Sequence, residues 1–207
     1  MVKSLPTPFH LPSTLHRLTL LVYEPAYLRV QNISSTRDSI ALPNLTHLTL
    51  HHRFSAQDRF VRSMETINRI GPQLRHLTIT AKNSTRDWTG ADLCTIPRVC
   101  AQLTELVIPS PLATWQASPC DYGHPILQTL GIPIMLRSSE WDFVSALDIF
   151  SRREAFPKLG TIRLVSWNGK RATNPWLEPH ALDLRVHGIR LEDCCGHPLP
   201  PASVLDD

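Results

Sequence analysis

The feature that most constrains this sequence is a short leucine pattern, L-x-x-L-x-L, which recurs along most of the chain. It is clearest in residues 42–50, LPNLTHLTL, where Leu45, Leu48 and Leu50 take the first, fourth and sixth positions. Seven copies begin at successive steps of 30, 29, 29, 24, 32 and 27 residues. Their first, fourth and sixth positions are Leu15-Leu18-Leu20, Leu45-Leu48-Leu50, Leu74-Leu77-Ile79, Leu103-Leu106-Ile108, Leu127-Leu130-Ile132, Leu159-Ile162-Leu164 and Val186-Ile189-Leu191. Regular recurrence of this kind is typical of repeat proteins.

The spacing within each copy predicts a short strand. Alternate side chains of a strand point to opposite faces, so the fourth and sixth positions face the same way. One strand cannot bury that face alone, whereas strands from successive copies, stacked side by side, form a parallel sheet with a continuous core. We therefore predict an α/β fold: a leucine-rich-repeat solenoid of about seven irregular repeats, with the parallel sheet on its concave face and with helices and loops outside.

A doubly wound α/β domain is the alternative, because its strands also recur at intervals of about 30 residues. Two features favour the solenoid. The strand starts resemble one another, which a doubly wound sheet does not require, and no glycine-rich phosphate loop follows the first strand.

The predicted organisation has three parts. Residues 1–14 form a proline-rich N-terminal segment or cap, residues 15–193 form the repeat domain, and residues 194–207 form a polar tail. Helices are predicted over 56–70, 89–99 and 139–153, with Pro97 expected to break or kink the second. The connections over 110–123 and 167–182 are rich in proline and glycine and are expected to be loops.

Composition and charge exclude several classes of function. The formal net charge is +3 without a dense basic run, so nucleic acid is not an expected partner. No apolar run reaches the roughly 20 residues that span a bilayer, and the N-terminal residues lack the apolar core of a signal peptide. Five cysteines, an odd number, do not suggest a disulfide framework. A cytoplasmic or nuclear location is therefore predicted.

The sequence contains no recognised motif for catalysis, for a cofactor or for a metal. The sequence has no G-x-S-x-G elbow, Walker loop or H-E-x-x-H. His187, Cys194, Cys195 and His197 do not match the usual zinc-ligand spacings, so no metal site is predicted. The chain is accordingly predicted not to be an enzyme and to need no cofactor. The alternative is a hydrolase-like α/β enzyme whose active site is unrecognised, with His51-His52 at a strand end as its candidate residues.

The third, fifth and seventh pattern positions should point away from the core and form the exposed face of the sheet. They present a mildly basic, hydrogen-bonding set of side chains, which suits an acidic segment of a partner protein. The candidate partner-binding residues are Arg17, His47, His51, His76, Glu105, Arg163 and Arg190.

The lines LPNLTHLTL, GPQLRHLTI, CAQLTELVI and FPKLGTIRL resemble the leucine-rich-repeat region of fungal F-box-like proteins, and the likeness covers roughly residues 15–191. The resemblance implies a target-recognition role in a ubiquitin-ligase adaptor. An F-box, which would dock the Skp1 adaptor, is not seen before Leu15, so a Skp1-type partner is not expected of this chain. A truncated fragment without an independent function is the remaining alternative.

Overall fold

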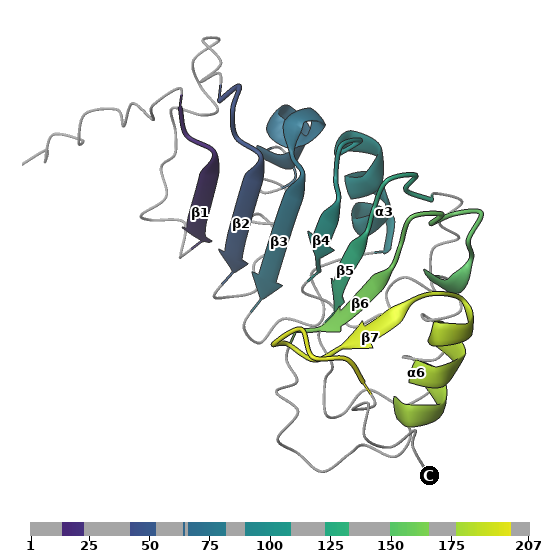
Figure 1. Cartoon of the computed structure of the whole chain (residues 1–207). Helices are drawn as coiled ribbons and strands as arrows, with labels where there is room; N and C mark the ends of the chain where they lie inside the picture. Colours follow the sequence, from purple (N-terminus) through teal and green to yellow (C-terminus); the bar gives the residue numbers. More distant parts are fainter. Residues whose placement is uncertain are drawn as a thin grey trace, which may run out of the picture.

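The computed structural model describes residues 14–22, 42–52, 64, 66–81, 90–108, 123–132, 150–165 and 177–199. These residues contain one open, seven-stranded sheet in which all neighbouring strands are parallel (Figure 1). The strands are β1 (Arg17–Val22), β2 (His47–His52), β3 (His76–Ala81), β4 (Glu105–Val107), β5 (Thr129–Ile132), β6 (Thr161–Leu164) and β7 (Arg190–Glu192). The predicted α/β class is confirmed. The strand order follows the chain from β1 to β7 and never reverses, unlike that of a doubly wound sheet.

Equivalent pattern positions lie opposite one another across the first six strands. The third positions of neighbouring strands pair in an unbroken row, as do the fourth positions beside them. The row of third positions is Arg17, His47, His76, Glu105, Thr129 and Thr161. This register follows from burial, because a one-residue slip would turn the leucines of a strand towards solvent.

The predicted seventh copy is wrong by two residues. Arg190, not Gly188, pairs with Thr161, and Leu191 pairs with Ile162. Val186 was predicted to begin the copy, but it ends the preceding helix and is 84% exposed. The reason is Gly188, whose φ of 68° provides the left-handed turn that commonly ends a helix, so the strand cannot begin before the turn is complete.

The core lies on one face of the sheet. In the second to sixth copies, every residue at the first, fourth and sixth positions is at most 1% exposed. The three leucines of the first copy, on the edge strand β1, are only partly buried. Leu177, Ala181 and Leu184 of helix α6 (Leu177–Val186) belong to the same buried cluster as the strand leucines. The helix therefore covers the leucine face.

The predicted helices are confirmed where the structure describes them, with two corrections, at Pro97 and at residues 152 and 153, which are not helical. Residues 64 and 66–70 are helical, with Met64 and Ile67 buried as expected, and the 3-10 helix η1 (Gly71–Gln73) follows. Helix α3 (Gly90–Val99) is not broken at Pro97, because the Cys100 N–H still donates to the Ile96 carbonyl at 2.8 Å. Of the helix predicted over 139–153, residues 139–149 lie outside the described residues, and 150 and 151 are helical.

Helix α6 corrects the loop predicted over 167–182, of which residues 167–176 lie outside the described part of the chain. Leu177, Ala181 and Leu184 are buried and follow the i, i+4, i+7 spacing of one helical face. Pro179 stands in the first turn, where the missing N–H would have no partner within the helix anyway. The loop predicted over 110–123 lies outside the described residues except for Gly123. In the described part of the chain, no helix combines the length and apolarity needed to cross a membrane.

Stability measurements on two matched variants test the account of the core. Leu77 and Leu18 occupy the same pattern position, but Leu77 is 0% exposed in a central strand, whereas Leu18 is only partly buried at the edge. We expect Leu77→Ala to lower the free energy of unfolding by about 2–5 kcal/mol, as is typical of buried leucines. Leu18→Ala should cost less. Equal losses in chemical denaturation would contradict the account.

Candidate binding face of the sheet

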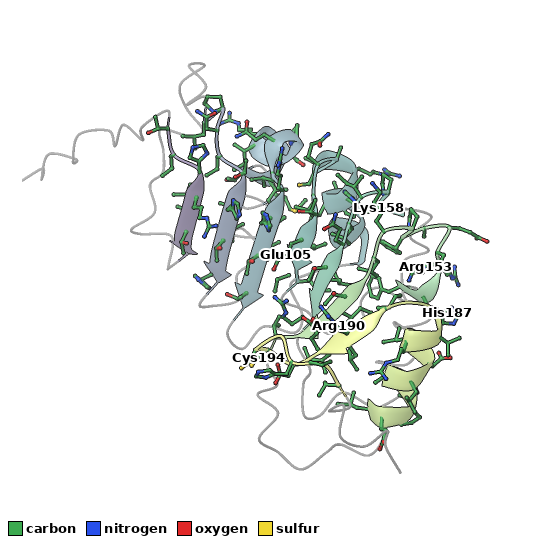
Figure 2. The ribbon with its side chains drawn as sticks, in the orientation of Figure 1. Glu105, Arg153, Lys158, His187, Arg190 and Cys194 are labelled. Carbon is green, nitrogen blue, oxygen red and sulfur yellow. The ribbon has the colours of Figure 1, made fainter. Side chains whose placement is uncertain are left out.

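The side of the sheet opposite the leucines carries polar side chains on most strands, and we call it the polar face. It consists of the third, fifth and seventh pattern positions, and Figure 2 shows Glu105 and Arg190 on it. Each candidate residue predicted from the sequence lies on its strand as expected, except that Arg190 occupies the row of third positions and not that of fifth positions. The predicted residues are therefore brought onto one surface by the register.

Two histidines stack at the centre of the β1–β3 half of the polar face. The rings of His47 and His76 lie 4.0 Å apart and are nearly parallel, with 8° between their planes. His76 Nδ1 lies 3.1 Å from the Glu105 carboxylate, and His47 Nδ1 lies 2.8 Å from the Thr46 hydroxyl. Neutral rings can stack at this distance, whereas two imidazolium rings would repel each other.

The pKa of His47 is lowered from its ordinary value of 6.5, chiefly by desolvation and then by the nearby His76 and Arg17. The folded state therefore binds the His47 proton less tightly than the unfolded state does. The contribution of neutral His47 to the free energy of unfolding is therefore complete above pH 6.5. It is lost as the pH falls from 6.5 towards the lowered pKa. An anion bound at this place would oppose the shift, because it favours the protonated ring.

His51, one of the two histidines that motivated the enzyme alternative, forms a hydrogen bond to a hydroxyl group. Its Nδ1 lies 2.6 Å from the Thr80 Oγ1 on the neighbouring strand. The two residues face each other in the register of β2 and β3. A general base is usually oriented by a carboxylate or a carbonyl, and this contact with Thr80 supplies neither. His51 and Thr80 instead add hydrogen-bonding groups to the polar face.

The β6–β7 half of the polar face is organised around a buried carboxylate, Glu192, which is 2% exposed. Arg163 Nη2 donates to one carboxylate oxygen at 2.9 Å, and Arg190 Nη2 lies 2.6 Å from the other. Arg163 also lies 4.0 Å from Glu105. Glu192 is the seventh position of the copy predicted to begin at Val186, and such positions were expected to be exposed. It is buried instead, because the two-residue shift places it opposite Arg163. Arg163 and Arg190 thus share the Glu192 carboxylate, which offsets one of their two positive charges.

Apolar side chains of β4 and of the residue after β6 lie in the middle of the polar face. Val107 was expected to face solvent but is 9% exposed, and a Cβ at Gly131 would lie 2.7 Å from Val107 Cγ2 and 2.9 Å from Val165 Cγ1. The two valines therefore close over the glycine of β5. In the β1–β3 half, no described residue forms an ion pair or hydrogen bond with the exposed Arg17 side chain. Among the arginines of the polar face, Arg17 is therefore the one without a described carboxylate partner.

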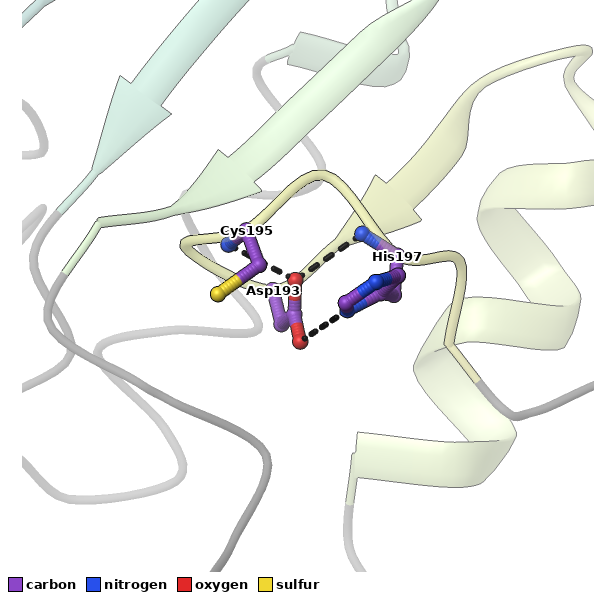
Figure 3. Close-up of side chains that lie close together, drawn as sticks. All are labelled: Asp193, Cys195 and His197. Atoms are coloured by element: carbon purple, nitrogen blue, oxygen red, sulfur yellow. Dashed lines mark hydrogen bonds and ion pairs between the residues drawn. The ribbon is translucent and has the colours of Figure 1, made fainter.

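A second cluster of polar side chains lies in the loop that follows β7 (Figure 3). The ligand-type atoms of Asp193, Cys195 and His197 all lie within 4.8 Å of one another. Burial tends to raise the pKa of Asp193, but hydrogen bonds from His197 and Cys195 outweigh it and leave the pKa lowered. Asp193 was not predicted as a site residue from the sequence, because only the spacings of Cys and His residues were considered.

Outside this cluster, burial raises the pKa of the Cys100 thiol to about 12, so this cysteine is expected to be unreactive.

Comparison with family models, with curated proteins and with solved structures gives no match for this chain. The resemblance to F-box-like proteins therefore stays a prediction. Inference about function starts from the polar face and from the loop after β7.

Stability measurements on two glutamate variants test the charge network. Glu192→Gln leaves both arginines facing a neutral amide in a buried position, and we expect a loss of about 1–3 kcal/mol in the free energy of unfolding. Glu105 is 33% exposed in its side chain, so solvent screens its contacts and Glu105→Gln should cost less than about 1 kcal/mol. The reverse order of the two losses would show that Glu192 does not organise the arginines.

Proposed function

We propose that this protein is a non-catalytic interaction scaffold, a short leucine-rich-repeat solenoid that binds a partner protein on its polar face. Support comes from the row of equivalent positions that runs across the first six strands in unbroken register. Each strand contributes side chains from the same pattern positions to one continuous surface. Such an extended surface is typical of the way repeat proteins bind their partners.

The β1–β3 half is the proposed contact region. Arg17 is exposed and has no described partner, while His47 and His76 are half-buried beside it. The arginines of the other half share the carboxylates of Glu192 and Glu105 and have less free charge to offer. This contact region is smaller than the one predicted from the sequence, which also included Arg163 and Arg190 as partner-binding residues.

The proposed partner is an extended acidic segment lying across the strands. Neighbouring strands are about 4.8 Å apart, so a partner chain that crosses them can place a carboxylate near successive strands. Protonation of His47 adds positive charge to the same region. Affinity for an acidic partner should therefore rise as the pH falls below 6.5, the ordinary value from which the His47 pKa is lowered.

The biological role that we propose is target recognition of the kind carried out by the repeat region of an F-box-like ubiquitin-ligase adaptor. It rests on the sequence resemblance together with the sequential parallel sheet. A Skp1-type adaptor is not part of this proposal for the chain itself.

Affinity capture with matched baits tests the proposal. The full chain is compared with Arg17→Ala/His47→Ala/His76→Ala and with a control, Arg152→Ala/Lys158→Ala. Lys158 precedes β6 and lies away from Glu105, as Figure 2 shows, and both control residues are exposed. We expect partners with acidic segments to be retained by the control and to bind the triple variant at least about tenfold more weakly, a loss of roughly 1.4 kcal/mol.

Two further readings accompany the capture. Circular dichroism establishes that each bait is folded. Binding of a captured partner to the wild-type chain is then measured at pH 7.5 and pH 5.5, and it should strengthen at the lower pH. Equal loss of partners from both variant baits, or retention by both, would contradict binding at β1–β3.

A further inference from the structure

We propose that the loop after β7 binds a thiophilic divalent cation of the zinc class through Asp193, Cys195 and His197. A carboxylate, a thiol and an imidazole are brought within 4.8 Å of one another (Figure 3). Thiolate, imidazole and carboxylate are the three ligand types that zinc takes in proteins. This site is independent of the proposed binding face, since it uses none of that face's contact residues.

The loop is closed at its base by backbone hydrogen bonds. The Asp193 N–H donates to the His197 carbonyl at 2.9 Å, and the Leu199 N–H donates to the Leu191 carbonyl at 2.8 Å. Gly196, with a φ of 86°, supplies the left-handed residue that lets the chain turn back. A closed loop holds its ligands in place before binding, which lowers the entropic cost of capturing an ion.

Asp193 has two different carboxylate oxygens. One, Oδ1, accepts hydrogen bonds from the Cys195 and His197 backbone N–H groups at 2.8 and 2.9 Å. The other, Oδ2, lies 3.1 Å from His197 Nδ1 on the side chain. The first oxygen fixes the turn, and the second remains directed at the imidazole. A role in the turn alone accounts for Oδ1 but not for the convergence of the second oxygen, the imidazole and the thiol.

The proposed ion would replace protons. Thiol, imidazole and carboxyl groups bind a metal ion in their deprotonated forms, so binding releases protons to solvent. Tetrahedral ligands at zinc distances lie roughly 3.3–3.8 Å apart, and the exposed Cys195 and His197 side chains can close the remaining gap by rotation. Cys194 Sγ lies 3.8 Å from Cys195 Sγ but is not among the three converging ligand atoms, so the proposed site has three protein ligands.

Titration of the reduced, chelator-treated full chain with Co²⁺ tests the site. We expect one equivalent to bind with thiolate-to-cobalt charge-transfer absorption, and added Zn²⁺ should displace it. Cys195→Ser and His197→Gln should each weaken Co²⁺ binding at least about tenfold, because even the loss of a ligand's outer partner costs that much. His187→Gln, which changes an exposed histidine outside the loop, is the matched control and should bind normally.

Two results would contradict the proposed metal site. Absence of the thiolate band from the wild-type chain would exclude the site. A band that survives Cys195→Ser unchanged would assign the metal to another thiol and also overturn the proposal. Because Cys195 and His197 are exposed, these variants are expected to keep the fold, which circular dichroism checks independently.

Discussion

Burial of the leucine face is the constraint on which this structure depends. A three- to six-residue strand with apolar residues at alternate positions has too little partner surface to be stable alone. Stacking successive copies in parallel completes the core, and the alternation of side chains then leaves the remaining positions on the opposite surface. The core and the polar face are thus two consequences of one register. A slip in any strand would disturb both.

The seventh strand shows how one local turn changes the chemistry of that surface. Gly188 ends the preceding helix, so β7 begins at Arg190 and pairs two residues further along the chain than the leucine pattern predicts. This shift places Glu192 opposite Arg163, where its carboxylate pairs with both Arg163 and Arg190 and offsets one of their two positive charges. Arg17, at the other end of the sheet, has no carboxylate partner among the described residues.

The repeating part of the fold was predictable from the sequence, because the alternation of apolar and polar residues within each strand determines which of its side chains are buried. Leu45, Leu48 and Leu50 specify their strand and its inward face without reference to any other segment. The roles of Glu192 and Asp193 could not be predicted in this way. Glu192 meets its arginine partners only because helix α6 ends where it does. The prolines of residues 167–182 led to the prediction of a loop in place of that helix. Asp193 meets Cys195 and His197 only through the turn at Gly196.

The register of β6 and β7 can be measured directly by cysteine cross-linking. In a background with Cys194 and Cys195 changed to serine, one double variant carries Thr161→Cys and Arg190→Cys, and a second carries Thr161→Cys and Gly188→Cys. Facing residues in neighbouring strands lie within the range of Cα separations that a disulfide accepts, whereas residues offset by two positions lie at or beyond its limit. The structure predicts efficient disulfide formation in the first pair and little in the second. Preferential cross-linking of the second pair would restore the register of the leucine pattern and remove Glu192 from between the two arginines.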